Sequence, residues 1–118
     1  MLKPREQFEQ TKQRRQLLIQ AMPEILNSVA QGTKKAHTTS HLDAKTKEFI
    51  SLGMSIMIKC DECILHHTIA LYDLGCSREE FCEALETAIV LQSCPGLKYS
   101  QIALEYFDQL DSEGDLDE

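Results

Sequence analysis

The segment 43–58, DAKTKEFISLGMSIMI, limits the fold more than any other part of the sequence. Its pattern predicts a helix with apolar side chains on nearly every side, and such a helix is stable only when other elements cover it. Asp43 is placed to cap this helix, because its carboxylate can accept hydrogen bonds from the first free N–H groups. Aromatic residues make up only 6% of the chain, so the surrounding core should be aliphatic and methionine-based.

The remaining sequence also has helical spacing. No segment shows the alternation of a β-strand, and no repeat of solenoid length occurs. We therefore predict an all-α fold of five or six helices, formed by residues 1–110 as a single domain. The acidic segment 111–118 is expected to be a disordered tail. Besides the central segment, apolar residues recur at helical intervals in 4–21, 22–37, 62–74, 78–92 and 97–110.

Residues typical of helix ends divide these segments. Gly32 and Gly75 are candidates for the residue that terminates a helix. Asp61 is a plausible cap for the helix that follows it. Ser77 and Glu80 have the spacing of a capping box, in which each side chain binds the backbone of the other residue.

Charge and hydropathy exclude several classes of function. Twelve basic and nineteen acidic side chains give a net charge of −7, which repels nucleic acid. The longest apolar run has ten residues, too few to span a bilayer, which takes about 20. The first residues lack the apolar core of a signal peptide, so we expect a cytoplasmic protein. Five cysteines are an odd count, which argues against a framework of structural disulfides.

The motif KCDECILHH, residues 59–67, contains the candidate reactive side chains, two cysteines and two histidines. Cys60 and Cys63 are spaced closely enough to form a disulfide at the start of a helix, where free N–H groups stabilise a thiolate. We expect this effect to be strongest at Cys63. His67 lies one helical turn after Cys63 and can exchange a proton with it. His66 points about 100° away around the helix and has no expected role.

A longer pattern includes this motif. Glu48 is followed after eleven residues by Cys60, after two more by Cys63 and after three more by His67. This pattern resembles the signature of the alkylhydroperoxidase D-like branch of the carboxymuconolactone decarboxylase family. The resemblance covers about residues 43–91. It implies an alkylhydroperoxidase D-like helical domain that forms homo-oligomers, often trimers or hexamers, and it implies no cofactor.

The resemblance also implies roles for individual residues. Cys60 and Cys63 would be the redox pair, with His67 and Glu48 as a proton relay. On one unbroken helix, Glu48 and Cys60 would lie roughly 18 Å apart, so the relay requires an antiparallel helical hairpin after about residue 58. The best-known peroxidases of the family have a histidine where this chain has Glu62. A carboxylate raises the pKa of a neighbouring thiol, so Glu62 is a candidate modulator.

These features favour a thiol-dependent peroxidase or disulfide reductase. Its substrate would be a hydroperoxide or a disulfide, and an unidentified dithiol protein or lipoyl-type carrier would reduce the Cys60–Cys63 disulfide. The alternatives are a decarboxylase-like proton-transfer enzyme and an oligomeric redox sensor without turnover. A zinc site is not expected, because the motif supplies three ligands and a closed site needs four.

The other cysteines and histidines have no expected role in this chemistry. The three remaining cysteines are expected to be small buried hydrophobic residues. Two histidines flank a polar loop and are expected to face water. These five residues are Cys76, Cys82, Cys94, His37 and His41.

Overall fold

The computed structural model describes the backbone of residues 2–38 and 41–117, and the side chains up to Glu113. Six helices make up the described chain, and these ranges contain no strand. The all-α prediction is therefore confirmed. Part of the polar loop, residues 39–40, lies outside the described residues. The helices are α1 (Pro4–Ala21), α2 (Pro23–His37), α3 (Ala44–Met57), α4 (Asp61–Asp73), α5 (Arg78–Gln92) and α6 (Cys94–Asp117).

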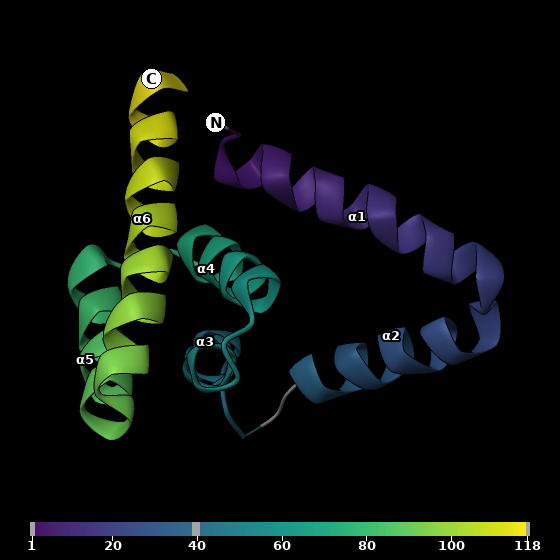
Figure 1. Cartoon of the computed structure of the whole chain (residues 1–118), viewed down its shortest axis with the longest axis horizontal. Coiled ribbons are helices and arrows are strands. Elements are labelled where there is room, and N and C mark those ends of the chain that lie inside the picture. The colour runs from purple at the N-terminus through teal and green to yellow at the C-terminus, as the bar shows by residue number, and fades with distance from the viewer. Residues whose placement is uncertain (1, 39–40, 118) are drawn as a thin grey trace.

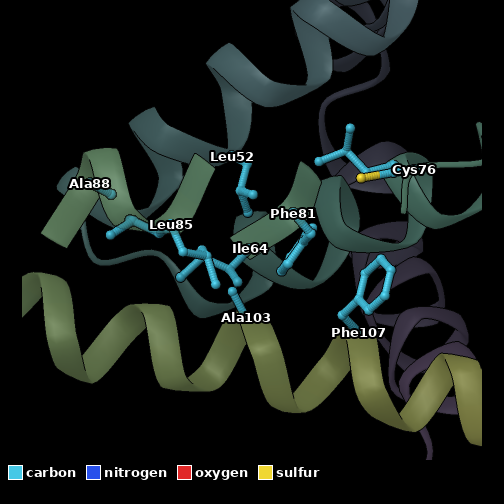
Figure 2. Close-up of a cluster of buried hydrophobic side chains, with 10 residues drawn as sticks. Leu52, Ile64, Cys76, Phe81, Leu85, Ala88, Ala103 and Phe107 are labelled. Carbon is cyan, nitrogen blue, oxygen red and sulfur yellow. The ribbon is translucent and has the colours of Figure 1, made fainter. Parts of the chain in front are cut away.

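Helix α3 supplies the centre of the hydrophobic core. Its Leu52 and Ile56 are fully buried against side chains from α4, α5 and α6. Two aromatic rings, Phe81 of α5 and Phe107 of α6, pack with their centroids 4.7 Å apart. Figure 2 shows how these side chains converge from the surrounding helices. The core cluster consists of Leu52, Ile56, Ile64, Leu71, Cys76, Phe81, Leu85, Ala88, Ala103 and Phe107.

The opposite face of α3 is not covered within one chain. Ile50, Met54 and Met57 are exposed, although the sequence predicted a helix covered on nearly every side. Helices α4, α5 and α6 pack against α3, whose buried residues are Leu52, Ser55 and Ile56, and these three side chains lie on one face of the helix. An apolar groove of about 380 Å³ runs along this open face between α3 and α5.

Most predicted helix ends are confirmed. The Asp43 carboxylate accepts a hydrogen bond from the N–H of Thr46, and Ser77 and Glu80 form the predicted capping box. Gly75 follows α4 with a φ of 81°, a left-handed conformation that glycine adopts without a steric penalty.

The prediction for Gly32 is wrong. Helix α2 continues through this glycine to His37. A glycine inside a helix costs only about 1 kcal/mol relative to alanine, and contacts at the helix end can offset that cost. The Nζ atom of Lys47 donates a hydrogen bond to the carbonyl of Ala36 in the last turn.

Helices α1 and α2 form an arm on one side of the core. In Figure 1 they make a V whose two open ends meet the rest of the molecule. Helix α1 packs against α4 and α6, whereas residues 23–37 of α2 include no buried side chain. Apolar side chains therefore remain exposed along the arm, namely Leu17, Leu18, Ile19, Met22, Ile25 and Val29.

Helix α6 extends beyond the expected domain boundary. It continues past Leu110 through acidic residues to Asp117. Disorder of the tail 111–118 in solution stays a prediction, and Glu118 lies outside the described residues. None of the helices in the described chain has the length and apolar character needed to cross a bilayer.

Candidate redox site

A tight turn between α3 and α4 builds the site. Lys59 adopts a left-handed backbone conformation with a φ of 59°, and the N–H of Cys60 donates to the carbonyl of Ser55 at 3.1 Å. The chain therefore reverses after α3, and α4 packs back onto it. The helical hairpin that the relay requires is present.

The two motif cysteines lie at the first turn of α4. Cys60 and Cys63 are joined as a disulfide, with their Cα atoms 5.2 Å apart, and both residues are partly buried. Cys60 is the N-cap residue, so the prediction that Asp61 caps this helix is wrong. The sulfur of Cys60 takes the place of the expected carboxylate, and Asp61 instead hydrogen-bonds to Tyr106 of α6.

An N–H group in the first turn of α4 contacts the disulfide. The N–H of Cys63 points to Sγ of Cys60 at 3.2 Å. Both sulfurs are bonded to each other, so the expectation that the helix N-terminus acts most strongly on a thiolate at Cys63 stays a prediction. Cys63 lies one helical turn from His67.

His67 and Glu48 are brought into contact by the hairpin. Nδ1 of His67 lies 2.6 Å from Oε2 of Glu48, and both side chains are largely buried. Burial by itself would raise the pKa of Glu48, but the hydrogen bond and charge of His67, together with His37 and His66, lower it below its ordinary value. The carboxylate is thus ionised at neutral pH. Because Nδ1 faces it, Nε2 of His67 is the nitrogen left for proton exchange.

A further histidine reaches the same carboxylate. Nδ1 of His37 lies 3.5 Å from Oε1 of Glu48, and its ring centroid is 6.4 Å from that of His67. His37 is still partly exposed, so the expectation that it faces water holds in part, and its ring also lies beside Glu48, whereas His41 is exposed as expected. No local spacing rule connects His37 with Glu48, because they lie on different helices joined by a loop.

Comparison with known proteins decides the family. The sequence model of the carboxymuconolactone decarboxylase family matches residues 20–105, which include the whole hairpin and the site. The chain belongs to this family. An uncharacterized protein of Cupriavidus necator is 36% identical over 94 residues, covering 79% of this chain and 82% of that protein.

A solved structure agrees with this assignment. The crystal structure of a carboxymuconolactone decarboxylase family protein from Legionella pneumophila, in its apo form, superposes with a TM-score of 0.81 at 30% identity. The match covers 86% of this chain and 90% of the Legionella protein. The fold predicted from the sequence is therefore the fold of the carboxymuconolactone decarboxylase family.

Helix α1 flanks the cysteine turn of this family member. The ring of Phe8 lies 5.3 Å from that of His66, and Nη2 of Arg15 lies 4.0 Å from Oε2 of Glu62. Partial burial and the nearby His67 lower the pKa of His66. The sequence identified Glu62 as a like-charged neighbour of the cysteines, but it did not predict that Arg15 would lie beside it.

The other three cysteines have different environments. Cys76 is buried as expected, and burial raises the pKa of its thiol to about 11. Cys82 is half-buried. The prediction that Cys94 is buried is wrong, because it begins α6 directly after the left-handed Ser93 and is exposed at that corner.

A metal centre needs several histidine, cysteine or acidic side chains grouped around one point. Among the described residues, no three histidine, cysteine or acidic side chains are grouped in a way that could hold a metal ion. The arrangement around α4 consists of a dithiol, an imidazole and a carboxylate. These groups can form a disulfide and can transfer a proton.

Proposed function

We propose that this carboxymuconolactone decarboxylase family member is a thiol-dependent peroxidase, a disulfide oxidoreductase that reduces hydroperoxides through Cys60 and Cys63. The observation that carries the proposal is the combination of a bonded cysteine pair with the 2.6 Å contact between His67 and Glu48. A dithiol alone can cycle between oxidised and reduced forms. An ionised carboxylate behind the imidazole adds the means to deliver a proton during peroxide cleavage.

The first step is attack of the Cys63 thiolate on a hydroperoxide. Nε2 of His67 takes the proton from the Cys63 thiol, and Glu48 stabilises the resulting imidazolium. The sulfur then forms an S–O bond while the O–O bond breaks. The imidazolium returns its proton to the departing alkoxide, which leaves as an alcohol. Cys63 becomes a sulfenic acid and the peroxide has been reduced by two electrons.

The second step forms the disulfide. The Cys60 sulfur attacks the sulfur of the Cys63 sulfenic acid, so an S–S bond forms and the S–O bond breaks, and the leaving hydroxide takes up the proton lost by the Cys60 thiol and departs as water. The N–H of Cys63 that faces Cys60 favours the thiolate form of this attacking sulfur. A dithiol protein or lipoyl-type carrier then reduces the disulfide through a mixed disulfide and restores both thiols.

Peroxide consumption by the reduced protein tests this proposal. When the reduced wild type is treated with an alkyl hydroperoxide, mass spectrometry should show a mass lower by two hydrogen atoms. Peptide mapping should place the new disulfide between Cys60 and Cys63. With dithiothreitol or dihydrolipoamide present, it should turn over repeatedly. Cys63→Ser should abolish turnover, whereas Cys94→Ser should retain it, because Cys94 is an exposed cysteine away from the motif.

The same assay separates the alternatives. One oxidation per chain without repeated turnover would indicate a redox sensor. Proton-transfer activity on a lactone acid that survives the double change Cys60→Ser and Cys63→Ser would indicate a decarboxylase-like enzyme. Unchanged peroxide turnover in Cys63→Ser would contradict the proposed function.

A further inference from the structure

The two carboxylate oxygens of Glu48 face two histidines from different helices. Oε2 binds His67 of α4 at 2.6 Å, and Oε1 lies 3.5 Å from His37 of α2. His37 is twice as exposed as His67, with side-chain exposures of 34% and 17%. The three groups therefore form a row, His67–Glu48–His37, in which the central carboxylate is the least exposed group at 12% and His37 is the most exposed.

The position of His37 is fixed by contacts at the end of α2. It is the last residue of that helix, where the free carbonyl groups favour a positive charge. Lys47, the neighbour of Glu48 on α3, donates a hydrogen bond of 2.6 Å to the carbonyl of Ala36. This bond ties the end of α2 to α3 directly beside the carboxylate.

Several charged groups surround this row. His67, His37 and His66 are the groups whose charges act on Glu48. Arg15 of α1 acts on His66. The Nζ atom of Lys47 donates a hydrogen bond to the Ala36 carbonyl. A protonated His37 is therefore a major partner with which His67 must share the single negative charge of Glu48.

We propose that His37 is a positioning residue that holds the outer oxygen of Glu48 and, through its own protonation, controls how firmly the carboxylate retains the proton of His67. When His37 is neutral, the carboxylate acts on His67 alone and stabilises its imidazolium. When His37 is protonated, it competes for the same charge and His67 releases its proton more readily. This role rests on the proposed function, in which His67 delivers a proton to the departing alkoxide.

Nuclear magnetic resonance of the histidine rings tests the coupling without any activity. The reduced, full-length protein is titrated as wild type, His37→Gln, His37→Arg and the exposed control His41→Gln. The rings of His37 and His67 lie 6.4 Å apart, so His37→Gln removes the positive charge of a protonated His37 at that distance from His67. With the dielectric constant of water, the loss of this charge should raise the titration midpoint of His67 by about half a pH unit. His37→Arg, which keeps a permanent charge, should give a midpoint at or below that of the wild type.

A second pair of variants tests the geometry. Lys47→Met removes the bond to the Ala36 carbonyl and should shift the His67 midpoint in the same direction as His37→Gln. Lys35→Met removes the same charge from the end of α2, at an exposed position, and should leave the midpoint unchanged. Circular dichroism confirms that each variant is folded before it is titrated.

The outcomes are distinct from those of the proposed function. An unchanged midpoint in His37→Gln, or equal midpoints in His37→Gln and His37→Arg, overturns the role of His37. If the wild type turns over peroxide, the pH profile of kcat in His37→Gln should move to higher pH with little change in KM. Identical kcat profiles for the wild type and His37→Gln would also contradict the role of His37. A wild type without peroxide turnover overturns the proposed function, while the ring titration still decides the coupling.

Discussion

Nδ1 of His67 lies 2.6 Å from Oε2 of Glu48, although nineteen positions of sequence separate the two residues. The contact exists because the chain reverses at Lys59 and α4 packs back onto α3. It connects the dithiol turn with a buried, ionised carboxylate.

Removing the charge of Glu48 should slow catalysis more than binding. Glu48→Gln keeps the shape of the side chain but can no longer stabilise the His67 imidazolium, so we expect kcat for hydroperoxide to fall about 100-fold, the usual contribution of general acid–base catalysis. Steady-state assays with dihydrolipoamide measure this change. Glu79→Gln, an exposed carboxylate on α5, should behave as the wild type. A Glu48→Gln enzyme with normal kcat would exclude the relay.

The same carboxylate should make stability depend on pH. Folding lowers the pKa of Glu48 below its ordinary value of 4.5, so its stabilising effect is complete above that pH and is lost as the pH falls through the lowered value. A hydrogen bond to a charged group contributes about 1.5–3 kcal/mol. Wild type should therefore melt several degrees above Glu48→Gln at pH 7, and the difference should shrink below pH 4.5. A difference that stays constant down to pH 2 would contradict this linkage.

Arg15 should partly offset the charge of Glu62 next to the cysteines. The pair is exposed and 4.0 Å apart, so its effect should be modest, about two-fold in rate. Arg15→Gln should slow the oxidation of the reduced protein by peroxide, and Glu62→Gln should accelerate it. Stopped-flow measurements check both, with Arg14→Gln as the control. Because salt screens exposed charges, the differences should nearly disappear at 1 M salt.

The free cysteines should differ in reactivity. Burial raises the pKa of the Cys76 thiol to about 11, so at pH 8 it is almost entirely protonated and a poor nucleophile. Cys94 is exposed. Treatment of the native protein with iodoacetamide, followed by peptide mass spectrometry, should label Cys94 first and Cys76 only after unfolding. Equal labelling rates would show that Cys76 is accessible and ionised.

The open apolar face should be covered by other copies of the chain. Ile50 and Met54 of α3 and Leu91 of α5 are exposed beside the groove between these helices. We expect a homo-oligomer, a trimer or a hexamer, in light scattering coupled to gel filtration. Met54→Glu places a charge in the face and should reduce the mass, whereas Lys98→Glu, exposed on α6, should not. A monomeric wild type would show that the face is not an interface.

Local sequence was sufficient for much of the fold and for the central part of the site. Caps such as Asp43 and Ser77 act on backbone groups within three residues, so their spacing predicts them directly. The prediction for Gly32 fails because a glycine permits a helix end without requiring one, and α2 continues to His37. The prediction for Asp61 fails because α4 begins one residue earlier than expected, with the sulfur of Cys60 at the cap position.

Local sequence patterns specify the helices, the cysteine pair and the spacing that connects this pair with His67 and Glu48. The contacts of His37 with Glu48 and of Arg15 with Glu62 follow only from how the helices pack. The difference lies in the range of the interactions involved. Helical periodicity and capping act over a few residues, whereas these two contacts depend on how the α1–α2 arm packs against α3 and α4, which no local pattern specifies.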